Sequence, residues 1–255
     1  MLSVLFQKIS FFLLKLIPFR LRWYLINFIY VSANFDFLSF HRINKLDIKL
    51  IKLGSHDANW IIPSEYLNSE SICYCFGVGE DASFDLEILS RYNCNVFSFD
   101  PTPRAISYVQ SKKITNKKFK FLSFGIWDKN EKIKFYAPQN KNHVSHSALN
   151  LQKTDSYFVA ECFDLLSLME KLNHRNVDLC KLDIEGAEYR VLNYMVNKGI
   201  KIPILCVEFD EAYNEIDSNC ILRINNILRL LIKNGYRIVQ KQSRANYLLI
   251  NYEKK

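Results

Sequence analysis

From residue 71 onward, apolar runs typical of buried strands alternate with segments whose apolar residues have helical spacing. The strand-like runs lie at 71–76, 95–99, 118–124, 177–184 and 202–209. The helix-like segments lie at 84–92, 104–111, 163–172, 187–197 and 219–233. Repeated strand–helix units predict an α/β fold, in which a mostly parallel sheet carries helices on both faces.

The end of the chain has a different pattern. Two strand-like runs, 236–240 and 247–252, follow Gly235, which we expect to cap the preceding helix. They predict an antiparallel hairpin that closes the sheet, and a second hairpin-like excursion is expected around 133–136. Only seven glycines and six prolines occur in 255 residues, which argues against long linkers. We therefore predict one domain over 71–255, preceded by a lead-in segment at 36–70.

Residues 1–35 form an apolar extension whose charges are all positive. Lys8 and Lys15 are seven residues apart and share one helical face. Apolar residues cover the other side, namely Leu2, Leu5, Phe6, Ile9, Phe12, Leu13 and Leu16. This pattern is typical of a helix lying in a membrane interface, so we expect peripheral membrane contact through residues 1–22. Packing on the protein's own core, a homodimer contact and a signal anchor are the alternatives.

The spacing of the cysteines and the placement of charge indicate the cellular compartment and the kind of partner. The seven cysteines lack CxxC or zinc-site spacing, which favours reduced thiols and a cytoplasmic protein, held at the membrane periphery if the extension binds lipid. The net charge is +8, and lysines cluster at 112–120. Because Phe119 and Phe121 alternate with lysines there, we expect the solvated edge of a sheet and no nucleic-acid partner.

A glycine loop follows the first of these strands. Gly77-Val78-Gly79 comes directly after the apolar run, and Asp100 ends the next strand 23 residues beyond Gly77. An acid in that place can accept hydrogen bonds from a ribose diol. Glu80 and Asp81, the latter at the third-glycine position, would repel a pyrophosphate. The cations of S-adenosylmethionine tolerate them, so the pattern favours this cofactor over a dinucleotide; a merely structural tight turn is the alternative.

The most informative motif is Lys181-Leu182-Asp183-Ile184-Glu185-Gly186-Ala187-Glu188. Carboxylates two positions apart at a strand's end point to the same side of the sheet, and ligands bind at that edge of open α/β sheets. Because neighbouring carboxylates raise the pKa of one member, Asp183 and Glu185 are candidate general bases. A salt bridge with Lys181, or helix-dipole stabilisation by Glu188, is the structural alternative.

His143 and His146 lie in a polar loop and form a second candidate pair, for catalysis or for substrate contact. Histidine is the side chain best suited to accept a proton near neutral pH. Glu208, which ends the fifth strand, is a candidate substrate contact in the same crevice. We predict no metal ion, and ligation by the two histidines with Asp183 or Glu185 is the less favoured alternative.

Together these motifs resemble the FkbM-type S-adenosylmethionine-dependent methyltransferases over about residues 70–250. The resemblance rests on Phe76-Gly77-Val78-Gly79, Phe99-Asp100-Pro101, Gly125-Ile126-Trp127-Asp128 and the acidic motif at 181–188. It implies a Rossmann-like class I methyltransferase fold with a seven-stranded, mostly parallel sheet. It also implies O-methylation of a hydroxyl on a sugar, a glycan or a small metabolite. A catalytically silent cofactor-binding or membrane-tethered interaction protein is the alternative.

The resemblance assigns roles to residues as well. The expected cofactor contacts are Phe76, Gly77, Val78, Gly79, Asp81, Asp100, Pro101, Ile126, Trp127, Asp128 and Asp183. In that set the glycines line the methionine end, Asp100 meets the ribose, and the segment 126–128 lies by the adenine. Family members commonly have an acid in place of Cys75 and a glycine in place of Asp81. Glu80 or Asp81 would then hold the methionine ammonium.

Overall fold

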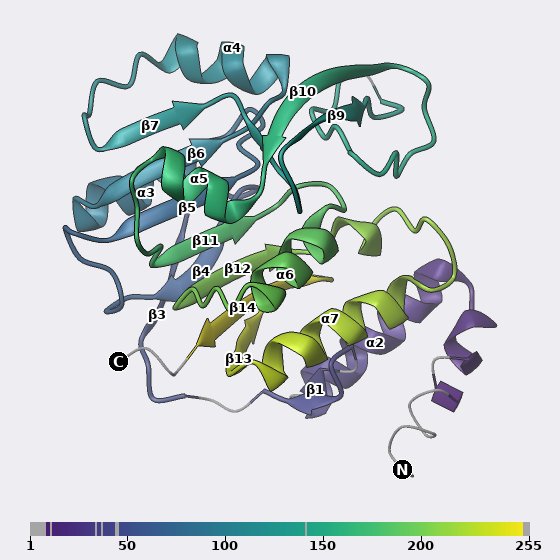
Figure 1. Cartoon of the computed structure of the whole chain (residues 1–255). Coiled ribbons are helices and arrows are strands. Elements are labelled where there is room, and N and C mark those ends of the chain that lie inside the picture. The colour runs from purple at the N-terminus through teal and green to yellow at the C-terminus, as the bar shows by residue number, and fades with distance from the viewer. Residues whose placement is uncertain are drawn as a thin grey trace.

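The computed structural model describes residues 9–10, 12–33, 35–36, 38–43, 46–140 and 142–251. Its centre is a seven-stranded sheet in the order β13-β14-β12-β11-β5-β6-β7 (Figure 1). These strands are β5 (Ile72–Phe76), β6 (Asn95–Phe99), β7 (Phe119–Leu122), β11 (Leu179–Leu182), β12 (Ile204–Glu208), β13 (Tyr236–Lys241) and β14 (Asn246–Asn251). β12, β11, β5, β6 and β7 are parallel, and β14 pairs antiparallel with both β12 and β13. The mostly parallel sheet with a C-terminal hairpin is confirmed.

Both faces of this sheet are buried, which is why its strands read as continuous apolar runs. In β5, Tyr74 and Phe76 belong to one core cluster, whereas Cys73 and Cys75 belong to the cluster on the other face. All seven cysteines are free and buried. At the edge, Phe119 of β7 is buried while Lys120 is exposed, as the lysine–phenylalanine alternation predicted.

Helices cover both faces of the sheet (Figure 1). One core cluster takes in side chains of α2 (Phe19–Ala33), α5 (Leu165–Lys171), α6 (Glu188–Asn197) and α7 (Cys220–Lys233). The other takes in α3 (Ser83–Tyr92), α4 (Pro103–Lys112) and the antiparallel pair β3 (Leu50–Leu53) and β4 (Trp60–Pro63). A short 3-10 helix, η1 (Asp210–Ala212), follows β12. No helix in the described part of the chain is long and apolar enough to cross a membrane.

The lead-in segment contains strands that the sequence did not predict. Besides β3 and β4, the two-residue strands β1 (Phe35–Asp36) and β2 (His41–Arg42) pair with each other. They are too short to show a period in the sequence. At the other end, Gly235 has a φ of +90° just past α7, which confirms its role as the cap. Leu2, Leu5, Phe6, Lys8 and Tyr252 lie outside the described residues.

A second, three-stranded sheet stands over the carboxyl edge of the main one. β10 (Tyr157–Phe163) pairs in parallel with β8 (Gly125–Ile126) and antiparallel with β9 (Glu131–Tyr136). The excursion expected around 133–136 is β9, but its partner β10 was missed. The helix expected at 163–172 begins only at Leu165, because Phe163 completes β10 and the Asp164 side chain caps the helix by accepting from Ser167 N.

Asp36 anchors the N-terminal part of the chain to the last two strands. Its fully buried carboxylate accepts hydrogen bonds from Tyr247 Oη (3.0 Å), Leu38 N (3.2 Å) and Ser39 N (3.1 Å). Lys241 Nζ, also buried, lies 3.4 Å from the same carboxylate. Burial lowers the pKa of Lys241, and Asp36 opposes that shift. The Lys241 ammonium therefore depends on Asp36 to remain charged inside the core.

Replacing Asp36 by alanine is expected to destabilise the protein by about 3–5 kcal/mol, because it leaves Lys241 buried without its carboxylate. Urea unfolding of both proteins measures the difference. Glu131→Ala is the matched control, since Glu131 pairs at 3.0 Å with the exposed Lys129 and should contribute at most about 1 kcal/mol. Equal losses from the two substitutions would contradict the role given to Asp36.

Candidate functional site

A pocket of about 360 Å³ opens at the carboxyl ends of β5, β6 and β11. The strand order reverses between β5 and β11, and such switch points are where ligands bind in open α/β sheets. The walls come from the loop after β5, the turn after β6, the β8–β10 excursion and the turn after β11. The volume lies in the range of small-molecule sites.

Glycine is required where the loop after β5 meets the turn after β11. Gly77 has a φ of +85°, and a Cβ on it would lie 1.8 Å from the backbone oxygen of Asp183. No L-residue with a side chain fits there, so Gly77 lets the two turns approach each other. Gly79, with a φ of +56°, faces Val144 of the excursion, 3.2 Å from the place a Cβ would take.

Asp100 holds the glycine loop in shape. Its Oδ2 accepts hydrogen bonds from Val78 N (2.9 Å) and Gly79 N (2.8 Å), and its Oδ1 accepts from Thr102 N (2.8 Å). The residue is only 5% exposed, yet it lines the pocket. A carboxylate has about four acceptor positions, so three bonds leave room for a further donor from a ligand.

Lys181 contacts both the loop after β5 and the turn after β11. Its buried ammonium donates to the backbone oxygen of Gly77 and lies 3.1 Å from Asp183 Oδ2. Burial lowers the pKa of Lys181, but Asp183 and the buried Asp85 outweigh that effect and raise it above its ordinary value. The lysine is therefore charged, and the salt bridge with Asp183, which the sequence offered as the structural alternative for this acid, is present.

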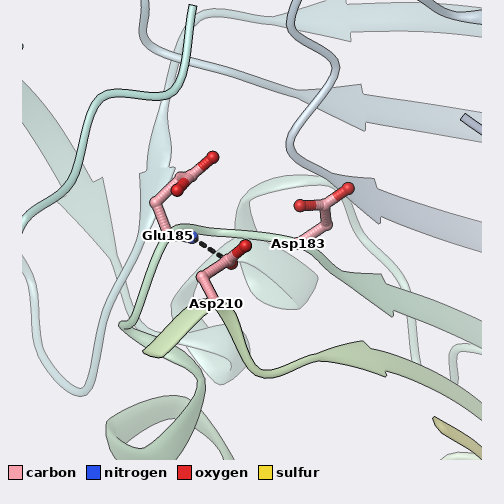
Figure 2. Close-up of side chains that lie close together, drawn as sticks. All are labelled: Asp183, Glu185 and Asp210. Atoms are coloured by element: carbon pink, nitrogen blue, oxygen red, sulfur yellow. Dashed lines mark hydrogen bonds between the residues drawn. The ribbon is translucent and has the colours of Figure 1, made fainter. Parts of the chain in front are cut away.

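The acidic turn itself does not continue the strand. β11 ends at Leu182, so Asp183 and Glu185 lie beyond the strand. The alternation of side chains in a sheet therefore does not explain why these two acids lie together. Glu185 instead has a left-handed φ of +56°, and its backbone N–H donates to Asp210 Oδ2 at 2.8 Å. Figure 2 shows the side chains of Asp183, Glu185 and Asp210 gathered at this turn, with Asp210 below the other two in the view. The two acids thus face the same way because of this turn.

Burial sets the protonation of this acidic group. It raises the pKa of Glu185 to about 7; a hydrogen bond with Ser145 opposes the shift, and the charges of Asp183 and Asp100 add to it. Burial and the surrounding carboxylates raise the pKa of Asp210 well above its ordinary range. Glu185 therefore exchanges its proton near neutral pH, whereas Asp183 has the Lys181 ammonium beside it.

Two further carboxylates lie behind this group. Burial raises the pKa of Glu188 to about 8, although its Oε1 accepts from Ile184 N and Gly186 N, both at 3.1 Å. Glu188 thus secures the turn from within rather than acting only on the dipole of α6. Burial also raises the pKa of Glu208 to about 8, with the charge of Asp183 adding to the shift.

In the described part of the chain, Asp183, Glu185 and Asp210 are the group that could bind a metal ion. One carboxylate oxygen from each lies within 4.8 Å of the others. Oxygen ligands at such spacing suit a hard divalent cation such as Mg²⁺. Neither His143 nor His146 belongs to the group, so the ligand set of histidines with acids is not assembled.

Most of the predicted site residues line the pocket. From the expected cofactor contacts these are Phe76, Gly77, Val78, Gly79, Asp81, Asp100, Pro101, Ile126 and Asp183. Among the other candidates, Glu185 and His146 line it as well. His146 Nδ1 is 2.9 Å from Val144 O, so a proton on Nδ1 would leave Nε2 as the acceptor.

Four predicted residues do not line the pocket. Trp127 is packed into a small core cluster, and Asp128 pairs with Arg190 at 2.9 Å. His143 is exposed, and its backbone is engaged: its N–H donates to Asn140 O at 2.9 Å and its oxygen accepts from Arg104 at 3.1 Å. Glu208 accepts from Asn246 Nδ2 at 2.9 Å and is not among the residues that line the pocket. Cys75, buried in β5, also lies away from the pocket walls.

Sequence reasoning missed Asp210 and Ser145. A signal for Asp210 exists, because Asp183-Ile184-Glu185 and Glu208-Phe209-Asp210 place the same acid–x–acid pattern after two strands that pair in parallel. Adjacent parallel strands bring such endings together. Ser145 offers no such signal, since only the folded loop brings it to Glu185.

Comparisons with known proteins bear on the fold and the family. Residues 67–238 match the family described as the methyltransferase FkbM domain. No curated protein sequence matches the chain significantly. Among solved structures, a Methanococcus jannaschii fibrillarin, described as a pre-rRNA processing protein, aligns at 12% identity over 85% of this chain and 88% of its own. Its TM-score is 0.42, a likeness too distant to inform function.

The raised carboxyl pKa values predict how stability depends on pH. Because the folded state binds these protons more tightly than an unfolded chain with pKa near 4.5, the free energy of unfolding falls as the pH rises from about 4.5 to about 8. Asp210→Asn removes one such group and should flatten this slope, by at most about 1.4 kcal/mol per pH unit. Thermal unfolding at pH values across this range measures how the stability of each variant depends on pH. Asp57→Asn, at a 93% exposed side chain, should leave the slope unchanged, and equal slopes in both variants would contradict the assignment.

Proposed function

This chain belongs to the FkbM methyltransferase family, and we propose that it transfers the methyl group of S-adenosylmethionine to a hydroxyl of a sugar, a glycan or a small metabolite. The observation that carries the proposal is the acidic pocket at the carboxyl edge of the sheet. Its glycine loop and Asp100 form one wall, and the Asp183–Glu185 turn forms another.

The charges of the pocket suit the proposed cofactor. Among the described residues, five acids line it, namely Glu80, Asp81, Asp100, Asp183 and Glu185, against one ammonium, that of Lys181. S-adenosylmethionine carries ammonium and sulfonium cations and no phosphate, whereas a dinucleotide would bring its pyrophosphate against these carboxylates. A cationic ligand therefore fits the lining far better than an anionic one.

Individual residues support this binding mode. Asp100 has an acceptor position left for a ribose hydroxyl, and Ile126 offers an apolar wall for the adenine. Asp81 is less suited to the methionine ammonium, since it accepts from Ser55 Oγ (2.6 Å) and Ser83 N (2.8 Å). Glu80 pairs with Arg104 at 2.5 Å across the rim, where it is partly exposed. Asp183 and Glu185 then supply negative charge close to the sulfonium.

The chemistry needs alignment and a proton acceptor, because S-adenosylmethionine supplies an already activated methyl group when bound. Glu185 has the properties of a general base. Its pKa of about 7 lets it accept the proton of the acceptor hydroxyl near neutral pH, where general bases act best. Asp183, fixed by Lys181, keeps its position while Glu185 exchanges a proton. Ser145 and His146 close the pocket from the excursion and can orient the acceptor.

Calorimetric titration of S-adenosylmethionine tests the cofactor assignment. We expect micromolar binding to the wild type and affinity reduced about 10- to 150-fold in Asp100→Ala, because a hydrogen bond to a charged group contributes roughly 1.5–3 kcal/mol. Asp57→Ala is the matched control, at an exposed acid away from the pocket, and should bind normally. Circular dichroism must show that each variant is folded. A folded wild type that binds no S-adenosylmethionine would overturn the proposal and favour an interaction protein.

Glu185→Gln tests the base directly. Radiolabelled methyl transfer to a panel of sugar and phenolic hydroxyls should fall about 10²- to 10⁴-fold, with cofactor affinity largely kept. In the wild type, kcat/KM should rise with pH through about 7, following Glu185. Glu208→Gln is the matched control, since Glu208 lies outside the pocket lining, and it should retain most of the rate. Full activity with an unchanged pH profile in Glu185→Gln would exclude Glu185 as the base.

A further inference from the structure

Two stripes of exposed apolar side chains run along the N-terminal helical segments. In each stripe four residues are spaced i, i+3, i+4 and i+7, which is the spacing of one helix face. The first stripe is Ile9, Phe12, Leu13 and Leu16, and the second, on α2, is Leu21, Tyr24, Leu25 and Phe28. Their exposed fractions run from 41% to 76%. We call these eight side chains the N-terminal apolar surface.

The other side of the same segments is already packed in the core. Leu14 is 4% exposed, Trp23 1% and Ile26 0%, so core packing accounts for one side of α2 and leaves its other apolar side in solvent. Eight of the thirteen exposed large apolar residues in the described part of the chain belong to the N-terminal apolar surface. Exposed apolar side chains gathered in this number are typical of interaction sites.

Charge identifies what fits against this surface. The charged residues before Asp36 are all cations, namely Lys8, Lys15, Arg20 and Arg22. Lys15 and Arg20 are exposed beside the stripes, whereas Arg22 is turned inward to Glu215 at 2.5 Å. Asp217, an acid in the loop between η1 and α7, pairs with Arg223 at 2.9 Å. The surface thus joins a large apolar area to exposed positive charge.

We propose that the N-terminal apolar surface docks on the surface of an anionic lipid bilayer, with both helical segments lying in the interface. Apolar side chains enter the boundary between headgroups and acyl chains, and cations beside them meet anionic headgroups. The extent is greater than the residues 1–22 expected from sequence, because Tyr24 and Phe28 are 76% and 70% exposed. Docking needs no unfolding, since the stripes already point away from the core.

A second copy of the chain fits less well. Face-to-face pairing of two copies brings the same patch, with its Lys15 and Arg20, against itself. Residues 1–35 offer no carboxylate to compensate them. Like charges brought together in an interface oppose association, whereas anionic headgroups reverse the sign of that interaction.

Flotation with lipid vesicles tests the proposal on the full chain. We expect the wild type to float with vesicles of phosphatidylcholine and phosphatidylserine, and less with phosphatidylcholine alone or at high salt. Tyr24→Ser with Phe28→Ser should reduce the bound fraction at least tenfold. Tyr157→Ser with Val159→Ser is the matched control, because these residues are 48% and 52% exposed on β10, and it should bind as the wild type does.

The charge is tested separately. Lys15→Gln and Arg20→Gln should each weaken binding to the anionic vesicles about fivefold, with no effect on vesicles of phosphatidylcholine alone. Thermal unfolding shows whether each variant is folded, and Phe12→Ser with Leu16→Ser provides a second stripe variant if the first is not. Equal flotation of stripe and control variants, or a dimeric wild type that leaves every vesicle unbound, would overturn the proposal.

Discussion

The buried Lys181 fixes the positions of the glycine loop and the acidic turn relative to each other. Lys181 lies inside β11 with its ammonium between Gly77 O, at the end of β5, and Asp183, at the end of β11. Removing a charge from water is costly, and the bonds to both turns compensate that cost only while the turns remain in place. Gly77 completes the arrangement, since a Cβ there would collide with Asp183 O. The glycine loop and the acidic turn therefore form as one unit.

The same arrangement concentrates negative charge where the sheet ends. Asp183, Glu185, Glu188, Glu208 and Asp210 lie close together, and burial is the largest cause of the raised pKa of Glu185, Glu188, Glu208 and Asp210. Such a cluster opposes folding above neutral pH, and sites of this kind are typical of functional rather than structural regions. When a cationic ligand enters, the carboxylates are already positioned around it, and their attraction to the ligand offsets their repulsion of one another.

Much of this could be predicted from the sequence, and the remainder depends on contacts that no local pattern encodes. The five parallel strands were predicted because burial on both faces leaves continuous apolar runs, and the motif around Asp183 marked the correct edge. β10 was missed although most of its residues are apolar, because it lies outside the repeating strand–helix units, and the two-residue strands β1 and β2 are too short to show a period. Trp127 and Glu208 were assigned to the pocket by motif and register, whereas packing and Asn246 turn them away from it. Tertiary contacts override position in a motif at both residues.

The most direct measurement is a crystal structure of the protein with S-adenosylhomocysteine, the product of methyl transfer. We expect the ribose hydroxyls to lie within hydrogen-bonding distance of Asp100 and the sulfur to face the Asp183–Glu185 turn. Lys181 should keep its contacts with Gly77 and Asp183. An adenosyl group bound elsewhere, or a sulfur directed away from Glu185, would contradict the roles given to Asp100 and Glu185.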